Sequence, residues 1–350
     1  MDTSKPHPTS STSGQRPPAP LPDDHDGLVL LSGRDLRQLL KPAQAIDALR
    51  QAYLQLASCR QDKGQSLGFA IDGGSIHVKA GLLPGSRRAF AAKVNVNLPN
   101  NWTLRRLPTI QGAVLLVDAI DGRPLAVMES MTLTALRTAA ATALAATFGA
   151  RRGSSVLAVI GCGVQAHYQV EALSACFPIE AVRVHDIDPA RAEGCAAALG
   201  ALFSQSTAVA SVAEAVVGAD ICVTCTTSKT AVLTSEMELS GCFVAAVGAD
   251  NPEKQEIDPA LMARARILVD DLEQCATGGD LAHALRAGLV AREDVCADLA
   301  QLVASQAMGR RAADDLVIFD STGSGIQDVA AAWAAYQAAR AAGLGARFAL

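Results

Sequence analysis

Aromatic residues are scarce in this 350-residue chain, and long hydrophobic runs are missing. Phe, Trp and Tyr make up 4% of it and charged residues 19%, whereas hydrophobic residues make up 50%. A core must therefore be built mainly from Ala, Val, Leu and Ile, and the apolar content is too high for a disordered chain. No stretch approaches the 18 or more uninterrupted apolar residues of a membrane-spanning helix, so no membrane partner is expected. An aromatic cage for a ligand is not expected either, and charge should carry most of its recognition.

The chain also lacks a basic excess and a disulfide framework. Its formal net charge of -5 disfavours nucleic acid as a partner. The nine cysteines are odd in number and irregularly spaced, which indicates a reducing compartment. No secretory signal is recognised, so a cytoplasmic location is expected. Cys222 and Cys225 form the only C-x-x-C pair, but they lie in the apolar run ADICVTC, so we interpret them as buried side chains and predict no metal site.

The chain divides into three segments of different character. Residues 1–26 hold six of the fifteen prolines and show no apolar periodicity, which predicts a disordered tail. At roughly 100 to 200 residues per domain, the rest is long enough for two domains. Residues 27 to about 133 mix a helical stretch at 42–58 with short alternating runs. From about 154 the chain alternates regularly between strand and helix.

The alternating runs of the first part predict half-buried strands. His77 and Lys79 should share one face of their strand, and Lys93, Asn95 and Asn97 one face of the next. The runs GAVLLVDA and PLAVME predict two further strands, joined by a turn at residues 121 and 122.

The run TLTALRTAAATALAATFG predicts a helix after these strands. Thr132 or Thr134 is the expected N-cap, and Gly149 is the expected stop. From 154, the strands VLAVI, AVRVH, ICVTC, FVAAVG, RILVD and LVIFD, with helices at 164–176 and from Pro189, predict a doubly wound parallel sheet. The final Ala-rich helix belongs to no further strand unit and should pack elsewhere.

A glycine motif directly follows the first strand of this second part. In VLAVIGCGVQA, Gly161 permits a tight turn, Gly163 lets a pyrophosphate approach the backbone, and Ala166 allows close helix-strand packing. The helix N-terminus then offers free N–H groups to phosphates. Asp186 ends the next strand, where an acid binds the ribose hydroxyls of a dinucleotide. The alternative is a glycine-rich turn that binds no nucleotide.

The expected cofactor is NAD(H) or NADP(H), with NAD(H) preferred. A carboxylate at Asp186 would repel the 2′-phosphate of NADP(H), whereas Arg183 and Arg191 lie close enough in sequence to weaken that preference.

Several segments outside this motif resemble the ornithine cyclodeaminase and mu-crystallin family. They are FAAKVNVNLPNN, TLTALRTAAATALAA, AVGADNPEKQEID and FDSTGSGIQDVAAA, in the family's order, and the resemblance covers residues 27–350. It implies a Rossmann NAD(P)-binding domain at 147–320, inserted into a discontinuous α+β substrate-binding and dimerisation domain made of 27–146 and 321–350. It also implies a homodimer.

The resemblance assigns roles to residues of the substrate site. Lys93 matches a substrate-binding lysine, Arg137 a carboxylate-binding arginine and Asp250 the catalytic aspartate. A guanidinium and an ammonium suit the carboxylate of an α-imino or α-amino acid. Lys79 is a further candidate for that carboxylate, and His77 stands where ornithine cyclodeaminases have a catalytic glutamate. The alternatives are a solvated Lys93, an exposed Arg137, a helix-capping Asp250 and strand-surface roles for Lys79 and His77.

The candidate cofactor residues follow the strands of the second part. They comprise the glycine-loop residues, Asp186 and residues that follow the later strands: Gly161, Gly163, Val164, Gln165, Ala166, Asp186, Thr226, Ser228, Val247, Gly248, Ser321 and Gly323. Ser321 and Gly323 belong to a segment that resembles the family segment lying against the cofactor.

Together these residues predict an NAD(P)H-dependent reductase of small cyclic α-imino acids. The specific expectation is reduction of Δ1-pyrroline-2-carboxylate to L-proline. Ornithine cyclodeaminase and alanine-type amino-acid dehydrogenase are alternatives within the family, and an early arginine of ornithine cyclodeaminases has no clear counterpart among residues 60–70. A non-catalytic, mu-crystallin-like binding protein is the alternative from another class.

Overall fold

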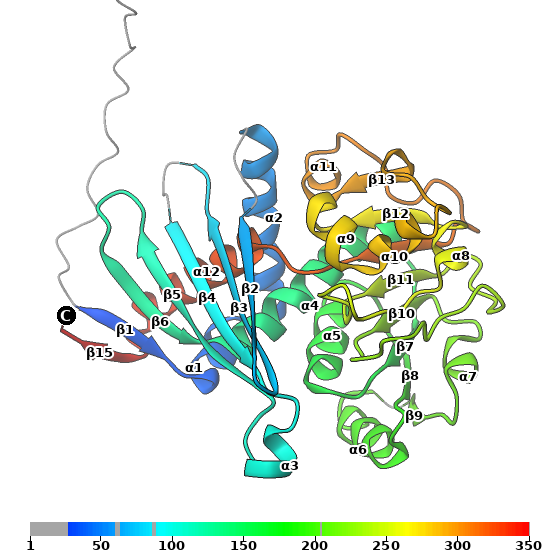
Figure 1. The fold of residues 1–350 in the computed structure, drawn as a ribbon, viewed down its shortest axis with the longest axis horizontal. Helices are drawn as coiled ribbons and strands as arrows, with labels where there is room; N and C mark the ends of the chain where they lie inside the picture. The colour runs from blue at the N-terminus through cyan, green and yellow to red at the C-terminus, as the bar shows by residue number, and fades with distance from the viewer. Residues whose placement is uncertain (1–26, 60–63, 86–88, 204, 350) are drawn as a thin grey trace, which may run out of the picture.

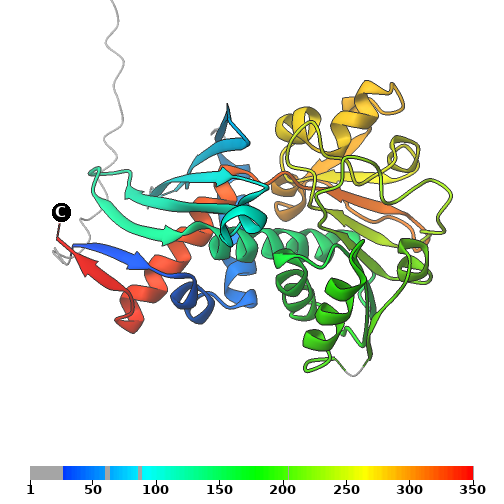
Figure 2. The same cartoon turned by 60° about the horizontal axis from the view of Figure 1, so that its bottom comes forward.

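Two β-sheets form two lobes that are joined through a long helix, α4 (Figures 1 and 2). The computed structural model describes residues 27–59, 64–85, 89–203 and 205–349, and the tail predicted at 1–26 lies outside them. Within these ranges, no helix is long and apolar enough to cross a membrane.

The first sheet has seven strands in the order β15-β1-β6-β5-β4-β3-β2. All neighbours are antiparallel except β1 and β6. The strands are β1 (Leu28–Leu31), β2 (Gln65–Ile71), β3 (Gly74–Leu82), β4 (Ala89–Asn97), β5 (Ile110–Asp118), β6 (Pro124–Glu129) and β15 (Ala346–Phe348). Sequence alternation predicted β3 to β6 and missed β1, β2 and β15.

The register of β3 and β4 confirms the predicted shared faces. Lys79 lies directly opposite Lys93, and His77 lies opposite Asn95. Cross-strand neighbours have Cβ atoms about 5 Å apart, so two lysines and a histidine are gathered on one face of the sheet.

Helices cover this face of the first sheet, and α3 lies in the β4–β5 connection. The helices are α1 (Gly33–Leu39), α2 (Pro42–Ser58), α3 (Asn101–Arg105), α4 (Ser130–Gly149) and α12 (Gly325–Ala342). The predicted helix at 42–58 is confirmed as α2. The final helix packs against α2, α4, β3 and β4 as expected, and leads to β15.

The predicted cap of α4 is wrong. The helix begins at Ser130, and the Glu129 carboxylate accepts hydrogen bonds from the N–H groups of Met131 (2.6 Å) and Thr132 (2.8 Å). A longer acidic side chain thus satisfies the first turn before either threonine is reached. The helix ends at Gly149 as expected, where a Cβ would lie 2.5 Å from the Phe243 ring.

The second sheet confirms the predicted doubly wound parallel architecture. Its eight strands run parallel in the order β13-β12-β14-β11-β10-β7-β8-β9. They are β7 (Val156–Ile160), β8 (Ala181–His185), β9 (Gln205–Ala208), β10 (Ile221–Thr224), β11 (Phe243–Ala246), β12 (Arg266–Val269), β13 (Val295–Asp298) and β14 (Val317–Asp320). The strand order reverses between β7 and β10, which is where such sheets bind ligands.

The remaining helices belong to the second lobe. They are α5 (Val164–Ser174), α6 (Pro189–Leu199), α7 (Val212–Val216), α8 (Pro259–Met262), α9 (Leu272–Gly278), α10 (Asp280–Arg286), the 3-10 helix η1 (Arg292–Asp294) and α11 (Leu299–Val303). The domain boundaries proposed at 146/147 and 320/321 stay a prediction, and the first of them falls inside the last turn of α4.

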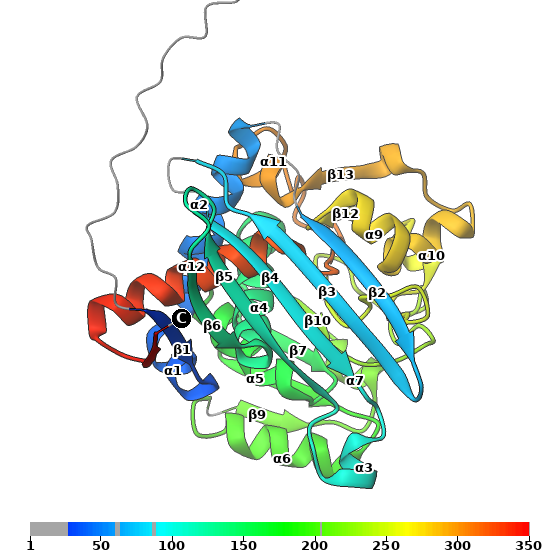
Figure 3. The ribbon, with the colours of Figure 1, turned by 60° about the vertical axis from the view of Figure 1, so that its left-hand side comes forward.

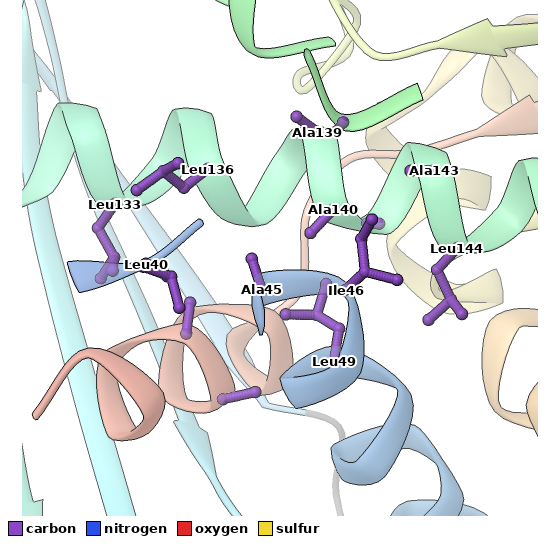
Figure 4. Packing of buried hydrophobic residues seen from close by; sticks show 14 of the residues in the cluster. Leu40, Ala45, Ile46, Leu49, Leu133, Leu136, Ala139, Ala140, Ala143 and Leu144 are labelled. Carbon is purple, nitrogen blue, oxygen red and sulfur yellow. The ribbon is translucent and has the colours of Figure 1, made fainter. Parts of the chain in front are cut away.

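Alanines pack α4 tightly between its neighbours. Figure 4 shows Leu40, Ala45, Ile46 and Leu49 against the α4 residues Leu133, Leu136, Ala140 and Leu144. The side chains of Ala139 to Ala141 and Ala143 to Ala146 are at most 2% exposed. Small side chains let the backbones approach closely, so α4 is held on all sides and anything it carries has a fixed position.

The opposite face of the first sheet is exposed and apolar. Figure 3 looks onto this face, with the helices behind the sheet. The register places Leu67 and Val94 on the face turned away from Lys79 and Lys93. We call this the outer face, and its exposed large apolar side chains are Leu67, Phe69, Ile71, Val94 and Leu115.

Candidate active site

The glycine loop lies between β7 and α5 with the geometry that a dinucleotide needs. Gly161 has φ +100°, which L side chains rarely adopt, and a Cβ there would lie 2.9 Å from the Cys225 carbonyl oxygen. Gly163 is the N-cap of α5, and a Cβ on it would meet no atom within 4 Å among the described residues. Val164 and Gln165 open the helix and Ala166 is fully buried. The uncapped N-terminus of an 11-residue helix is thus turned to a loop open enough for a phosphate.

Asp186 follows β8 beside this loop. Its Oδ2 accepts a hydrogen bond from the Cys162 N–H at 2.7 Å, and its Oδ1 accepts one from the Asp188 N–H at 3.0 Å. The two arginines near it in sequence are engaged elsewhere. Arg183 donates to the Val217 carbonyl, and Arg191 pairs with Asp188 at 3.5 Å. Among the described residues, neither arginine is therefore paired with the Asp186 carboxylate.

A buried carboxylate, Glu256, joins the loops after β10 and β11. Its Oε1 accepts from the Thr226 N–H at 2.6 Å, and its Oε2 accepts from Thr224 Oγ1 at 2.8 Å and the Gly248 N–H at 2.7 Å. The Ser228 N–H donates to Thr226 Oγ1 at 3.1 Å. Burial raises the pKa of Glu256, although these donors lower it. The predicted cofactor residues Thr226, Ser228, Val247 and Gly248 are thereby brought to one edge of the sheet.

The segment after β14 is fixed by a second buried carboxylate, Asp270. Its Oδ2 accepts from Ser321 Oγ at 2.9 Å and from the Gly323 N–H at 2.7 Å. Gly323 has φ +78°, and a Cβ there would lie 2.2 Å from Nη1 of Arg137. The predicted cofactor segment therefore lies directly against a predicted substrate residue.

Lys93 and Arg137 meet at a residue that we did not predict. Lys93 Nζ and Arg137 Nε each donate to Oδ1 of Asp328 at 2.9 Å. Lys93 also donates to Thr134 Oγ1 at 3.2 Å, and Arg137 Nη1 donates to Gln327 Oε1 at 2.8 Å. Lys93 and Arg137 are each 4% exposed, so neither is the solvated residue of the alternative interpretation.

Lys79 joins this group from β3. Its Nζ donates to the carbonyl oxygens of Thr322 (2.8 Å) and Gly323 (2.9 Å). Burial lowers the pKa of Lys79, and Arg137 lowers it further, whereas Asp250 and Asp328 raise it. Burial likewise lowers the pKa of Lys93 to about 7, although Asp328 raises it. We call Lys79, Lys93, Arg137 and Asp328 the cation group. When both lysines are protonated it carries three positive charges and one negative charge, which favours an anionic ligand.

Asp250 faces the cation group from the second lobe, after β11. Its side chain is 52% exposed, and its Oδ1 accepts from Lys254 Nζ at 2.8 Å. Partial burial would raise the pKa of Asp250, but Lys254, Lys79 and His77 lower it below its usual value. Asp250 is therefore a carboxylate at neutral pH, and it interacts electrostatically with Lys79 of β3 across the two lobes.

His77 lies on the same strand face as Lys79. Its Nε2 shares a hydrogen bond of 2.8 Å with Ser75 Oγ. The structure thus brings His77, Lys79, Lys93, Arg137 and Asp250 together.

Four buried polar residues of this site were missed: Glu256, Asp270, Gln327 and Asp328. Asp270 directly follows the strand RILV, and acids at the carboxyl ends of parallel strands are a recognisable signal. Asp328 lies in the first turn of an Ala-rich helix, and its burial is unusual for a charged residue, so nothing in the sequence indicated that it belongs to the site. In the described part of the chain, no three His, Cys, Asp or Glu side chains are placed to hold a metal ion.

The chain is similar to known proteins over most of its length. A model described as "Ornithine cyclodeaminase/mu-crystallin family" matches residues 33–343. The chain is 33% identical to an alanine dehydrogenase of Archaeoglobus fulgidus over 91% of its own length and 97% of the relative's. It is 31% identical to a Δ1-pyrroline-2-carboxylate reductase of Bacillus cereus (91% and 99%) and 33% identical to an ornithine cyclodeaminase of Agrobacterium fabrum (68% and 66%).

The fold is also similar to solved structures. The Δ1-pyrroline-2-carboxylate reductase of Thermococcus litoralis in complex with NADH and L-proline superposes with a TM-score of 0.86, at 29% identity, over 92% of this chain and 100% of that one. An archaeal alanine dehydrogenase dimer with bound NAD superposes with a TM-score of 0.84, at 32% identity, over 92% and 98%.

Proposed function

The chain belongs to the ornithine cyclodeaminase/mu-crystallin family, and on that premise we propose that it is an NAD(P)H-dependent reductase of small cyclic α-imino acids. The specific reaction proposed is reduction of Δ1-pyrroline-2-carboxylate to L-proline. The observation that carries the proposal is the excess of positive charge in the cation group, opposite the carboxylate of Asp250. One side attracts the substrate carboxylate and the other stabilises a positive charge.

The carboxylate of the imino acid binds to the cation group. Arg137 and Lys93 share one buried anion, and Lys79 is bound to neutral carbonyl oxygens, so a substrate carboxylate reduces the net positive charge of the group. Charge-assisted hydrogen bonds of this kind are about twice as strong as neutral ones. This carboxylate anchor determines which end of the small cyclic substrate faces the second lobe.

Asp250 acts on the imine nitrogen. It is ionised at neutral pH and therefore stabilises the protonated imine, which is the form that accepts a hydride. Because its side chain is half exposed, it can also exchange a proton with solvent. A bound reduced nicotinamide supplies the hydride to the imine carbon.

NAD(H) is the proposed cofactor in preference to NADP(H). The glycine loop, the free N-terminus of α5 and the Asp186 carboxylate fit a dinucleotide with an unsubstituted ribose. The engagement of Arg183 and Arg191 with other partners supports the preference, because neither is left to neutralise a 2′-phosphate.

A homodimer paired through the outer face is part of the proposal. Large exposed apolar patches on a soluble protein mark interaction sites. The outer face lies on the side of the sheet opposite the cation group, so pairing there leaves the site accessible. An archaeal alanine dehydrogenase of known structure is a dimer, which supports a dimeric state, and the choice of the outer face rests on its exposed apolar side chains.

The side chain at position 77 of β3 disfavours the cyclodeaminase alternative. This strand carries His77, bonded to Ser75, at the position where the resemblance aligns the catalytic glutamate of ornithine cyclodeaminases. Reduction of a preformed imine needs a carboxylate anchor, a proton and a hydride, and does not require that glutamate.

An absorbance assay at the nicotinamide band tests the proposal. Purified protein is supplied with NADH or NADPH and with pyrroline carboxylate, piperideine carboxylate, or pyruvate with ammonia, and in reverse with ornithine and NAD. We expect turnover of the cyclic imines and its loss in Arg137→Ala, while the exposed-arginine control Arg123→Ala keeps full activity. Ornithine conversion to proline and ammonia consumes no net NAD, so it is followed by ammonia release. Ammonia release from ornithine without turnover of the imines would establish the cyclodeaminase, and no turnover of any of these would establish the binding protein.

A further inference from the structure

One carboxylate oxygen holds both predicted substrate cations. Asp328 lies in the first turn of α12 with its side chain 1% exposed, and its Oδ1 accepts from Lys93 of β4 and Arg137 of α4. Its Oδ2 is buried and finds no hydrogen-bond partner among the described residues. Three elements that are distant in sequence are thus joined at one atom.

The Arg137 guanidinium is fixed in orientation by two acceptors on α12. Nε donates to Asp328, and Nη1 donates to Gln327 Oε1. Gln327 is in turn fixed, because its Nε2 donates to Tyr53 OH (2.9 Å) and to Asp270 Oδ2 (3.0 Å). A planar guanidinium bonded at two of its nitrogens cannot rotate, so its remaining edge points in one direction.

The charge of Asp328 also acts on Lys93. Burial and the neighbouring cations Arg137 and Lys79 all lower the pKa of Lys93, and Asp328 is the acid that raises it. Lys93 and Arg137 in turn lower the pKa of Asp328, so it remains a carboxylate at neutral pH. From the second lobe, Asp250 acts on the same group through Lys79.

From this arrangement we infer that Asp328 is the positioning residue of the substrate-carboxylate anchor. It orients Lys93 and Arg137 through one shared oxygen and supplies a negative charge that offsets part of their positive charge when the site is empty. The substrate carboxylate then binds N–H groups of Lys93 and Arg137 that Asp328 does not use, and it does not displace Asp328. The inference rests on the proposed function for the identity of the ligand, but the contact between Asp328 and Lys93 can be tested without it.

The first arm of the test needs no substrate. The chain has seven lysines, so isotope-labelled lysine side chains can be followed by NMR, and Lys93→Met assigns the resonance of interest. Titration of the free protein is expected to give Lys93 a pKa near 7 in the wild type, at least one unit lower in Asp328→Asn, and partly restored in Asp328→Glu. An unchanged Lys93 titration in Asp328→Asn would overturn the inference.

The second arm uses turnover. Asp328→Asn should raise KM for the cyclic imino acid about tenfold or more, since Lys93 and Arg137 lose their shared charged acceptor. It should also move the alkaline limb of the kcat/KM profile to lower pH, with an unchanged Kd for NADH. Asp118→Asn is the matched control, a buried aspartate at the end of β5 and outside the anchor.

The two arms separate the two hypotheses. Wild-type protein without imine reductase activity would contradict the proposed function and leave the NMR titration to decide on Asp328. A rise in KM accompanied by an equal loss of NADH affinity would show general damage and overturn the positioning role.

Discussion

The Glu256 carboxylate provides a test of how the cofactor edge of the second sheet is held together. It is fully buried and accepts three hydrogen bonds, from the backbone N–H groups of Thr226 and Gly248 and from the hydroxyl of Thr224. The two backbone N–H groups bind different oxygens of the carboxylate. In Glu256→Gln, one of these oxygens becomes an NH2 group, so whichever way the amide turns, one backbone N–H faces a donor.

The expected cost follows from that single lost acceptor. Leaving a buried N–H unsatisfied costs about 1 to 3 kcal/mol. Urea unfolding should therefore show Glu256→Gln to be less stable by about that amount, and the Kd for NADH, measured by fluorescence titration, should rise about tenfold as the two loops separate. The Km for the imino acid, measured at saturating NADH, should change much less, because the cation group lies on other elements.

Glu253→Gln is the matched control, three residues away on the surface, where Glu253 pairs with Lys229. It should be indistinguishable from the wild type in both measurements. Equal stability and equal NADH affinity in Glu256→Gln and Glu253→Gln would refute the reasoning, because the loops would then not depend on the buried carboxylate.

Three further predictions concern pH, assembly and cofactor choice. Burial and the charge of Glu256 raise the pKa of Asp280 to about 7, so the folded state keeps a proton that the unfolded chain releases near pH 4. The contribution of Asp280 to the free energy of unfolding should therefore be greatest below pH 4 and be lost as pH rises through 7, by up to about 1.4 kcal/mol per pH unit. In urea unfolding, the stability of Asp280→Asn should depend less on pH than that of the wild type. Phe69→Asp on the outer face should yield monomers in analytical ultracentrifugation, and an unchanged mass would exclude that face as the interface. Asp186→Asn keeps an acceptor for the Cys162 N–H but removes the charge, so the ratio of kcat/KM for NADPH to that for NADH should rise about tenfold; an unchanged ratio would contradict the role of Asp186.

Local patterns were sufficient for much of the fold. Alternation predicted β3 to β6 and, through its period of two, put His77 with Lys79 on one face of their strand and Lys93 with Asn95 on one face of the next, and the structure places these faces together. The strand-glycine-helix pattern located Gly161 and Gly163, because a tight turn and a close phosphate approach need glycine wherever they occur. Four of the missed strands, β2, β9, β13 and β15, lie at sheet edges, where side chains are less buried and the apolar pattern is weak, and the fifth, β1, lies next to the edge strand β15.

The buried acids of the site could not be predicted from such patterns. Asp328 and Arg137 are 191 residues apart, and nothing local to either indicates the other. An isolated aspartate in an Ala-rich helix is ordinarily a solvent-facing residue, and only the packing of α12 against β4 and α4 turns it inward. The prediction of the α4 N-cap was wrong for a different reason: Glu129 reaches the first turn with a side chain longer than those of the usual capping residues.

The most direct test of the central claim compares two substrates that differ only in the group to be anchored. NADH-dependent reduction of Δ1-pyrroline-2-carboxylate is measured against reduction of Δ1-pyrroline, which lacks the carboxylate, in the wild type and in Arg137→Ala. A buried charge pair that loses one partner costs about 2 to 5 kcal/mol, so the wild type should prefer the carboxylate by at least about 30-fold in kcat/KM, and Arg137→Ala should lose most of that preference. Equal kcat/KM for the two imines in the wild type, or a preference that survives in Arg137→Ala, would contradict the account.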